Sequence, residues 1–314
     1  MSLGRAAIGI TTPLDLAAAG DEVCAQGGSL PFKLHESSSA SPGAEMPLVM
    51  HTEAASGLAH AWYCADRRTL ELHASADDLV GADLIFLSYL LLETQLQRLG
   101  FITLHGAAIE RDGRAAVLLG HSGAGKTSSA VTLCRDFGCR LIGNDLVIVG
   151  GLGELRAVSG TTHLRLRCSS VRRCLPELAH LFDDDTPDPW RAKKDITPEE
   201  AGIAVSRRGA TDVTAVIFVH VDDGYGECVV TQGDTWIHRG NLYENALRHI
   251  RATATPWLTG KERRFGPYVP SLDDASVHAT RTATLGRLLE RSYYVAGRQR
   301  DVAACIDELL RTAS

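Results

Sequence analysis

The spacing of hydrophobic and polar residues changes near residue 100 and divides the chain into two parts. Before it, short alternating runs at 58–63 and 69–73 predict strands, and the serine-rich stretch 35–43 predicts an exposed loop. Dense apolar residues over 79–99, preceded by two aspartates that can cap a helix, predict a buried helix. We therefore expect a small N-terminal α+β region over residues 1–100 and a larger domain over residues 101–314.

The pattern after residue 100 is that of an α/β unit. Residues 101–109 and 115–119 are predicted strands joined by a turn at 111–114, and a glycine-rich loop and a helix over 126–136 follow. The next apolar run, 140–149, is interrupted only by Asn144 and Asp145. The order strand, loop, helix, strand is typical of paired strands around a crossover helix.

The remaining elements have fewer turn-forming residues between them. We expect strands at 162–167 and 214–221, helices at 170–182, 241–252 and 298–310, and a mobile loop at 183–194. Lys193 and Lys194 in that loop could close over a substrate, or they could belong to a solvated charged stretch.

Composition excludes several classes of protein. The net charge of −6 argues against broad electrostatic binding of nucleic acid. No apolar run approaches the roughly 20 residues of a membrane span, and the first residues do not form a basic segment followed by an apolar block. The eight cysteines include no C-x-x-C pair. We expect a cytoplasmic protein with reduced thiols and with neither a nucleic-acid nor a membrane partner.

The strongest chemical signal is the stretch 120–127, which reads Gly-His-Ser-Gly-Ala-Gly-Lys-Thr and matches G-x-x-x-x-G-K-[ST] at every fixed position. Glycines let backbone N–H groups curve around phosphate oxygens, and the start of the following helix adds partial positive charge. Lys126 would reach the β- and γ-phosphates, and the Thr127 hydroxyl would be a ligand of Mg²⁺. We expect the nucleotide to contact Gly120, Ser122, Gly123, Ala124, Gly125, Lys126, Thr127 and Ser128.

Asp145 is the expected second metal contact, because it follows the next strand, 19 residues after Lys126. A carboxylate in an apolar run is costly unless it is paired or bound to a metal. The alternative is a strand-end aspartate that caps the turn. Asn144 beside it could orient a water molecule or a phosphate.

Three stretches together resemble the catalytic core of the HPr kinase/phosphorylase family over about residues 104–149. They are the strand Leu104-His105-Gly106-Ala107-Ala108-Ile109, the loop 120–127, and the strand Arg140-Leu141-Ile142-Gly143-Asn144-Asp145. A further stretch, residues 239–246, looks like the Gly-Arg-Asn segment near the C-terminus of that family, with its first residues in a different order.

The resemblance implies a P-loop fold of the HPr kinase/phosphoenolpyruvate carboxykinase type, with a mixed, twisted sheet, and transfer of phosphate from ATP with Mg²⁺ to a serine hydroxyl. By motif position His105, Lys126 and Asp145 match catalytic residues, with Thr127 and Asp145 at the metal. The acceptor would be a hydroxyl-bearing peptide, protein or small molecule. The family is often hexameric, which makes a homo-oligomer an expectation from the same resemblance.

Two departures from the family pattern indicate a divergent relative and not a genuine HPr kinase. Asn144 replaces the first of the two aspartates, which is thought to be the base in that family, and Ser128 replaces a glutamate. An amide cannot accept a proton at neutral pH, so Asp145 and His105 are the candidate bases. Two alternatives stay open: a nucleotide-binding regulatory or scaffold protein with little transferase activity, and an enzyme of the carboxykinase type.

Four further residues are weaker candidates. Arg165, Arg167 and Arg239 could each stabilise the charge that develops on a transferring phosphate, although surface arginines are common. His121 lies inside the loop, and we expect its side chain to point outward.

Overall fold

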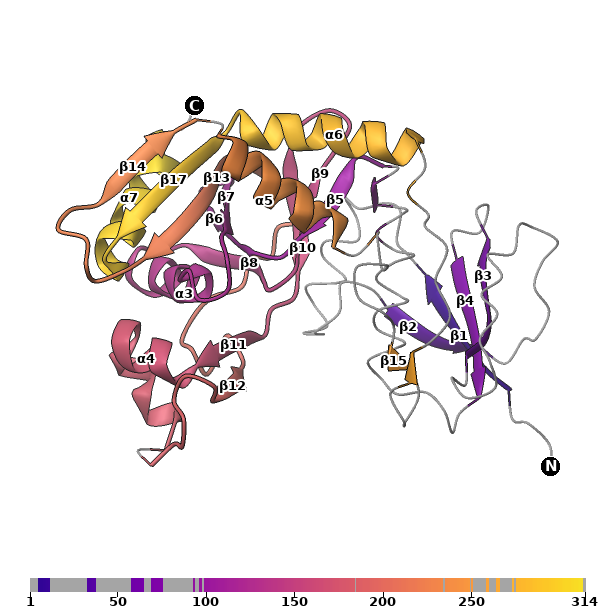
Figure 1. Ribbon diagram of the computed structural model, residues 1–314, viewed down its shortest axis with the longest axis horizontal. Helices are drawn as coiled ribbons and strands as arrows, with labels where there is room; N and C mark the ends of the chain where they lie inside the picture. Colours follow the sequence, from indigo (N-terminus) through magenta and orange to yellow (C-terminus); the bar gives the residue numbers. More distant parts are fainter. Residues whose placement is uncertain are drawn as a thin grey trace. The chain divides into compact units, whose positions relative to one another are not determined.

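The computed structural model describes most of the chain after residue 99 and a few strands before it (Figure 1). Side chains are described from Glu93 onward, except in two short strands, β15 and β16. The described residues are 5–11, 33–37, 58–64, 69–75, 93, 96–97, 99–183, 185–233, 235–248, 250, 258–259, 264–265, 273 and 275–312.

The described N-terminal strands form a four-stranded antiparallel sheet in the order β2-β1-β4-β3. The two predicted strands are confirmed as β3 and β4. The predicted loop at 35–43 is wrong for residues 35–37, which belong to β2, and residues 38–43 lie outside the described residues. Of the predicted helix at 79–99, only Glu93, Leu96 and Gln97 are described as helical. The bounds are β1 (Arg5–Thr11), β2 (Lys33–Ser37), β3 (Leu58–Cys64) and β4 (Thr69–Ser75).

The described residues fall into two compact units. The first contains this sheet, the residues just before Gly100, and the segment 246–281; the second contains residues 100–245 and the chain after Arg281. The sequence-based division into 1–100 and 101–314 did not separate the segment 246–281. Within the first unit, the buried Arg281 guanidinium bonds to Gln97 Oε1 at 2.8 Å and to the carboxylate of Asp273 at 2.9 and 3.0 Å. The bond to Gln97 joins residues that are far apart in the sequence, and the pairing with Asp273 is a charge-assisted hydrogen bond.

The second unit is built on a nine-stranded mixed sheet. The central strand β13 is parallel to β7 and to β17, and the other described pairs in this sheet are antiparallel. The carboxyl ends of three parallel strands therefore meet at one edge of the sheet. The bounds are β5 (Phe101–Leu104), β6 (Ala107–Arg111), β7 (Arg114–Leu119), β8 (Arg140–Asn144), β9 (Val147–Gly150), β10 (Arg156–Gly160), β13 (Thr211–Val221), β14 (Val229–Gln232) and β17 (Ser292–Gly297).

The run 101–109, predicted as one strand, and the apolar run 140–149 each form two strands. The run 101–109 breaks at His105 and Gly106, and the run 140–149 breaks at Asp145, which has a φ of 64°. An aspartate tolerates this left-handed conformation better than most residues do. The break has a topological reason: β8 pairs with β6, whereas β9 pairs with β5 and β10. The predicted hairpin between β6 and β7 is confirmed.

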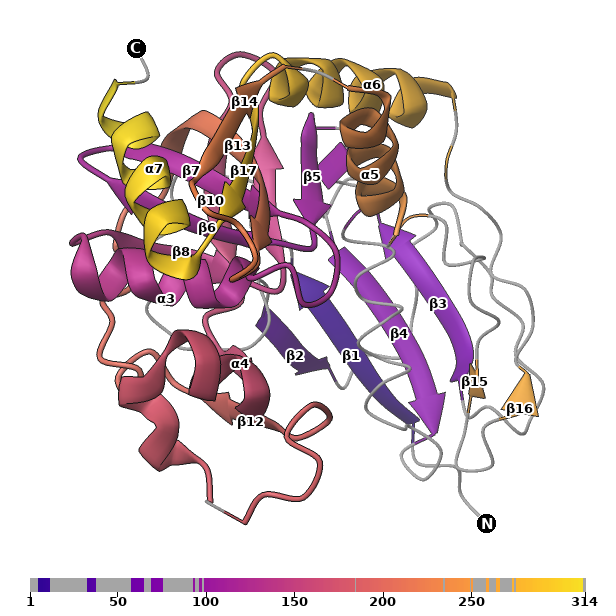
Figure 2. The same ribbon diagram turned by 60° about the vertical axis from the view of Figure 1, so that its left-hand side comes forward.

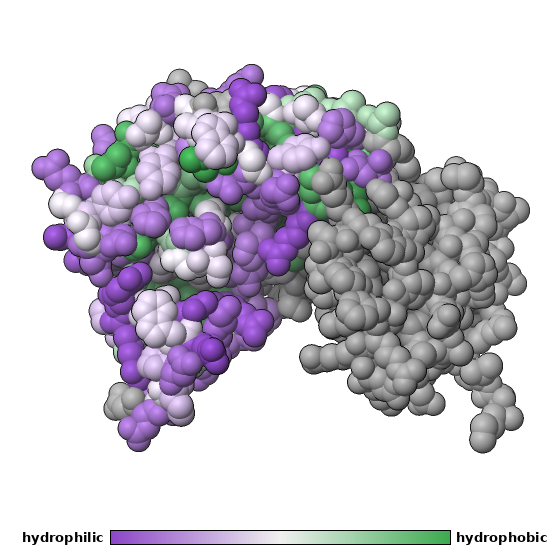
Figure 3. All heavy atoms as spheres, viewed as in Figure 1, coloured by the Kyte–Doolittle hydropathy of each residue, from purple (hydrophilic) through white to green (hydrophobic). Residues whose placement is uncertain are grey.

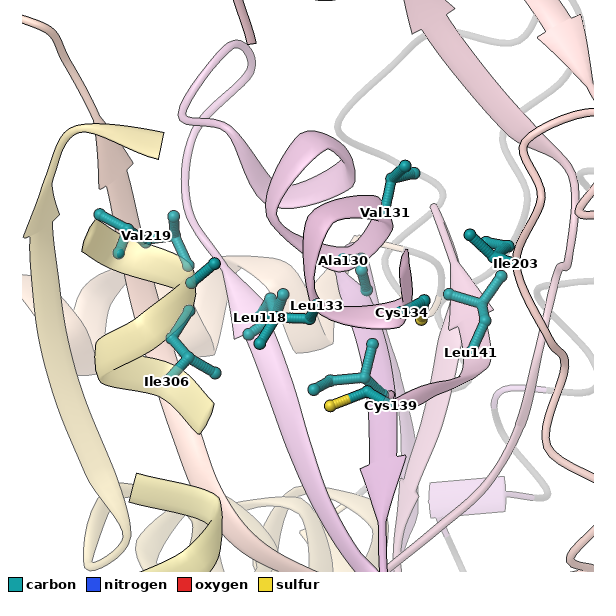
Figure 4. Close-up of a cluster of buried hydrophobic side chains, with 14 of the residues drawn as sticks. Leu118, Ala130, Val131, Leu133, Cys134, Cys139, Leu141, Ile203, Val219 and Ile306 are labelled. Atoms are coloured by element: carbon teal, nitrogen blue, oxygen red, sulfur yellow. The ribbon is translucent and has the colours of Figure 1, made fainter. Parts of the chain in front are cut away.

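Helices α3 (Lys126–Asp136) and α7 (Gln299–Thr312) lie side by side against one face of the sheet (Figure 2), and the predictions for both are confirmed. Figure 4 shows their buried side chains meeting those of β7, β8 and β13. On α7 the buried apolar residues recur with helical spacing, which places one stripe of the helix on the sheet. This stripe consists of Val302, Ala303, Ile306 and Leu310.

The segment after β10 corrects two predictions. The helix expected at 170–182 is instead α4 (Cys168–Cys174) and the 3₁₀ helix η1 (Pro176–Leu181), because Pro176 has no N–H and disfavours helical geometry at the residue before it. Part of the predicted mobile loop at 183–194 is strand β12 (Lys193–Ile196), which pairs with β11 (Leu164–Arg167). Lys193 and Lys194 therefore lie in a strand.

Helix α5 (Trp236–Leu247) begins five residues before the predicted start, and residues 249 and 251–252 of that prediction lie outside the described residues. The sequence pattern missed α6 (Ala275–Leu289), β10, β14 and β17. Strands β15 (Leu258–Thr259) and β16 (Arg264–Phe265) form a separate short pair.

The described surface is mostly hydrophilic on the face in Figure 3, with hydrophobic residues in scattered spots. No helix among the described residues is long and apolar enough to cross a membrane. The six cysteines whose side chains are described are free thiols: Cys134, Cys139, Cys168, Cys174, Cys228 and Cys305.

Candidate nucleotide-binding site

The glycine-rich loop 120–127 connects the buried end of β7 to the first residue of α3. Gly125 is the N-cap of α3 with a φ of 97°, a conformation that L side chains rarely adopt, and no side chain caps this helix. No acidic residue lies in its first turn. The first backbone N–H groups of a helix have no partner within the helix and attract anions, so this terminus has the chemistry of a phosphate site.

Lys126 folds back over the loop. Its Nζ donates hydrogen bonds to the carbonyl oxygens of Gly120 at 2.8 Å and His121 at 3.1 Å, and the side chain is largely buried. These contacts hold the ammonium group at the start of the loop, where a phosphate above the loop would meet it. Both backbone polar groups of Ala124 have partners within the protein: its N–H donates to the His121 carbonyl, and its carbonyl accepts from the N–H of Val221.

Thr127 contacts Asn144, a residue to which the sequence pattern assigned only a possible orienting role. The Thr127 hydroxyl donates to Asn144 Oδ1 at 2.9 Å, and Asn144 Nδ2 donates to the carbonyl of His163 at 3.1 Å. The backbone of Asn144 is also bound on both sides by Thr161, through its carbonyl and its hydroxyl. With an exposed fraction of 1%, the Asn144 side chain is fixed at the end of β8.

Asp145 and His105 are brought together through the backbone. The carbonyl of Asp145 accepts a hydrogen bond from the N–H of Gly106 at 3.2 Å. Gly106 is needed there, because a Cβ would lie 2.6 Å from the Leu118 carbonyl oxygen at the end of β7. These contacts place the turn that carries His105 next to the bend at Asp145 and next to the end of β7, from which the loop begins.

Asn245 of α5 holds the main chain of His105. The N–H of His105 donates to Asn245 Oδ1 at 2.6 Å, and Asn245 Nδ2 donates back to the His105 carbonyl at 3.2 Å. One amide side chain thus pairs with both polar groups of one residue, as a neighbouring strand would. The only sequence signal for this contact was the stretch 239–246, which resembles a C-terminal segment of the HPr kinase/phosphorylase family.

The Ser128 side chain is turned toward α7 and away from the loop. Its hydroxyl donates to Gln299 Oε1 at 2.9 Å and to the Gly125 carbonyl at 3.0 Å, while Gln299 Nε2 reaches the hydroxyls of Ser129 and Thr132. Only the main chain of Ser128 therefore remains at the helix start. The buried network fixes the first turn of α3 to the first turn of α7.

The other predicted residues have different surroundings. Arg165 is exposed and pairs with Asp195 of β12 at 3.7 Å, and Arg167 donates to the carbonyl of Trp190 at 2.5 Å. Lys194 Nζ donates to the Leu181 carbonyl at 2.9 Å. These contacts hold β11, β12 and η1 together. Arg239 is exposed on α5.

A row of aromatic side chains beside the loop was not found from the sequence. The exposed His121 ring is parallel to that of His220 on β13, with centroids 5.7 Å apart, and His220 meets Tyr225 edge-on at 5.9 Å. Burial, together with a hydrogen bond between its hydroxyl and Tyr225, raises the pKa of Tyr294 on β17 to about 12. His220 follows the apolar run 215–219 of β13, and that pattern gave no signal that its ring would meet the loop.

Magnesium would depend on few protein ligands here. Among the described residues, no group of three or more His, Cys, Asp and Glu side chains is placed to hold a metal ion. Mg²⁺ is commonly held by one or two protein oxygens together with substrate phosphates and water, and the hydroxyl of Thr127 and the carboxylate of Asp145 are oxygen donors of that kind. The donor chemistry therefore fits Mg²⁺ bound with a polyphosphate.

Comparisons with known proteins give weak structural similarity and no sequence match. No family model matches the chain, and no curated protein matches it. Among solved structures, the chain is similar to the Hpr(Ser) kinase/phosphatase from Coxiella burnetii, with 14% sequence identity and a TM-score of 0.26, over 43% of this chain and 66% of that one. At this identity and TM-score the similarity does not establish a family for the chain.

Proposed function

We propose that the chain binds a nucleoside triphosphate with Mg²⁺ at the loop 120–127 and transfers its γ-phosphate to a hydroxyl group. The observation that carries the proposal is the complete G-x-x-x-x-G-K-[ST] loop between a buried strand and an uncapped helix N-terminus, with Lys126 folded over its start. The resemblance of residues 104–149 to the HPr kinase/phosphorylase core supports the same reaction and a divergent P-loop fold of that type.

Each residue of the site would have its own role in phosphate transfer. The backbone of the loop and the start of α3 would bind the phosphates, and Lys126 would neutralise charge on the β- and γ-phosphates. Thr127 and Asp145 would hold Mg²⁺, which supplies further neutralisation of the charge that develops during transfer. His105 would lie beside the phosphates, held in place by Asn245. Phosphoryl transfer asks the protein chiefly for positioning and charge neutralisation, so this set is sufficient in kind.

A second candidate function is nucleotide binding without transfer, as in a regulatory or scaffold protein. It is favoured by Asn144, whose side chain occupies the place beside Thr127 and whose amide cannot accept a proton. The two candidates differ in what happens after the nucleotide binds.

The deciding experiment measures binding and transfer separately. Calorimetry with Mg²⁺ and ATP or GTP is compared for the unmodified chain, Lys126→Ala and the control Lys193→Ala, whose lysine is exposed on β12. Circular dichroism reports whether each variant is folded. Transfer of radiolabel from [γ-³²P]ATP is then measured to a panel of serine-containing peptides and small alcohols.

We expect binding and transfer in the unmodified chain and in Lys193→Ala, and a loss of both in folded Lys126→Ala. Binding without label in any acceptor would favour the regulatory alternative. No binding of either nucleotide by the folded, unmodified chain would overturn both.

A further inference from the structure

The transferring end of the loop can be located from Lys126. In loops of this sequence the lysine reaches the β- and γ-phosphates, and here its Nζ lies 2.8 Å from the Gly120 carbonyl and 3.1 Å from that of His121. The γ-phosphate would therefore lie over the start of the loop, at Gly120 and His121. An acceptor hydroxyl has to come within about 3–3.5 Å of the phosphorus at the same place.

Two imidazole rings stand at this end of the loop. The exposed ring of His121 and the half-buried ring of His220 are parallel to within 6°, with centroids 5.7 Å apart. His220 belongs to the long strand β13, next to its last residue, whereas His121 belongs to the loop itself. β7 and β13 are parallel neighbours, with Phe218 opposite Leu119, so the loop after β7 and His220 near the end of β13 lie at the same edge of the sheet. Ligands of open α/β sheets bind at the carboxyl ends of the strands.

The ring of His220 has two ring neighbours. His121 stacks on it, and the ring of Tyr225, in the turn after β13, meets it edge-on at 5.9 Å. Tyr225 in turn forms a hydrogen bond with Tyr294 of β17, and burial raises the pKa of Tyr294 to about 12. From α5, His238 packs on Phe218 and reaches Tyr294 at 6.2 Å. A ring on a strand, fixed by its neighbours, is better positioned for proton transfer than one on a loop.

The position beside Thr127 cannot supply the base. Asn144 carries an amide, and both of its polar atoms are engaged, Oδ1 with Thr127 and Nδ2 with His163. Asp145 is assigned to the metal in the proposed function, and a carboxylate that holds Mg²⁺ is a poor proton acceptor.

Another group can therefore take the proton of the acceptor hydroxyl, and an imidazole is the side chain that exchanges protons near neutral pH. Of the two histidines in question, His105 is held through its main chain by Asn245, whereas His220 has its ring beside His121 at the Lys126 end of the loop.

We propose that His220 is the general base of the transfer reaction and that His121 is a positioning residue that stacks on it. The inference rests on the proposed function. As the oxygen of an alcohol bonds to the γ-phosphorus of the nucleotide, the bond from that phosphorus to the β,γ-bridging oxygen breaks and a nucleoside diphosphate leaves. The acceptor proton passes to the free ring nitrogen of His220, and the imidazolium later returns it to water.

The first test uses water as the acceptor, because the natural alcohol is not identified. Hydrolysis of [γ-³²P]ATP with Mg²⁺ is followed between pH 5.5 and 9 for the unmodified chain, His220→Asn and His220→Gln. The matched control is His180→Asn, whose histidine is exposed on η1. In the unmodified chain and in the control we expect the hydrolysis rate to fall as the pH is lowered through this range, near neutral pH; we call this fall the acid limb. Both His220 variants should lose the acid limb.

The expected loss of rate in the His220 variants is about 100-fold at pH 8, at the lower end of what a general base contributes. Nucleotide affinity, measured by calorimetry, should change less than threefold, which separates loss of a base from loss of the binding site. His121→Asn should keep the acid limb and lower the rate to a smaller extent. An acid limb that persists in folded His220→Asn and His220→Gln would overturn the proposal and leave the proposed function intact.

The second test does not depend on turnover. In protein labelled with ¹³C-histidine, the His220 Cε1–H signal is assigned by its absence in His220→Asn and is followed on addition of ADP, Mg²⁺ and AlF₄⁻, a mimic of the transferring phosphate. We expect the signal to move toward the imidazolium position and its titration midpoint to rise, because a nearby polyanion favours the charged ring.

The outcomes of the second test separate the two proposals. Binding of the mimic with no change at His220 would exclude a base at this position. Absence of binding by the folded, unmodified chain would instead overturn the proposed function, and with it this inference.

Discussion

The hydroxyl of Thr127 and the side-chain oxygen of Asn144 are 2.9 Å apart and joined by a hydrogen bond, and this contact ties the start of α3 to the end of β8. Asn144 completes its hydrogen bonding with the carbonyl of His163. The amide can serve both contacts at once because it has an acceptor oxygen and a donor nitrogen. A carboxylate in the same place could serve only the first.

The substitution Asn144→Asp should therefore destabilise the fold in a pH-dependent way. It places an acidic oxygen against the His163 carbonyl and buries a charge, which costs about 1–3 kcal/mol for the lost donor. Burial raises the pKa of such a carboxyl above its value in the unfolded chain, so the unfolded state releases its proton first and stability falls as the pH rises from about 4 toward 7.

Urea unfolding of Asn144→Asp at pH 5 and at pH 7.5 measures this effect. Asn144→Leu, which has no titratable group at this position, is the control and should show the pH dependence of the unmodified chain. Equal losses of stability in Asn144→Asp at the two pH values would show that the side chain has moved out of the buried position.

Asn245→Ala should loosen the turn at His105 and Gly106. The variant removes both hydrogen bonds that the amide makes to the His105 main chain, each worth about 0.5–1.5 kcal/mol. Hydrogen exchange followed by mass spectrometry should show faster exchange of the His105 amide, with the amides of β13 unchanged. Asn241→Ala, an exposed position one turn earlier on α5, is the control. Unchanged exchange at His105 would mean that the turn is held by other contacts.

Leu133→Ala should be strongly destabilising. Leu133 lies on α3 in the fully buried cluster between the helix and the sheet (Figure 4). Truncation of a buried leucine leaves a cavity and costs about 2–5 kcal/mol. Leu152→Ala, at a position with an exposed fraction of 77%, should change the free energy of unfolding by less than about 0.5 kcal/mol. Chemical unfolding of the two variants compares them directly, and similar values would contradict the assigned packing.

Cys228 should react slowly with alkylating agents in the folded protein. Burial, and then a hydrogen bond with Cys305, raises the pKa of its thiol to about 12, so the thiolate at pH 8 is about a thousandfold scarcer than for an ordinary cysteine. The greater nucleophilicity of a weakly acidic thiol recovers part of this, and we expect iodoacetamide to react about 10- to 100-fold more slowly than with free cysteine.

Peptide mapping after timed alkylation measures that rate, and the same reaction in 8 M urea is its control. The rate should rise about tenfold per pH unit above pH 8, because the folded protein keeps the proton until the pH nears 12. A rapid reaction in the folded state that levels off near pH 9 would contradict the raised pKa.

Local sequence predicted the elements whose signal is contained in a few consecutive residues. The hairpin of β6 and β7, the helix after the glycine-rich loop and the helix α7 were all predicted, because turn residues and helical periodicity act over short stretches. Prediction was wrong at 101–109, which was predicted as one strand and breaks at His105 and Gly106, and the sequence did not show the reason for the interruption at Asn144 and Asp145. The bend at Asp145 exists because β8 and β9 pair with different strands, and no residue near Asp145 records that pairing.

For the candidate site, the chain order of glycines, Lys126 and Thr127 was enough to indicate a phosphate loop, since spacing along one strand–helix turn is a local property. The neighbours of that loop were decided by tertiary structure. Asn245 and His220 are more than 90 residues from Lys126 in the sequence. They reach the site because Asn245 bonds to His105, the residue after β5, and because β13 pairs with β7. The sequence determines which side chains the protein has. Which of them share one edge of a sheet depends on strand order, and strand order is set by the burial of the whole core.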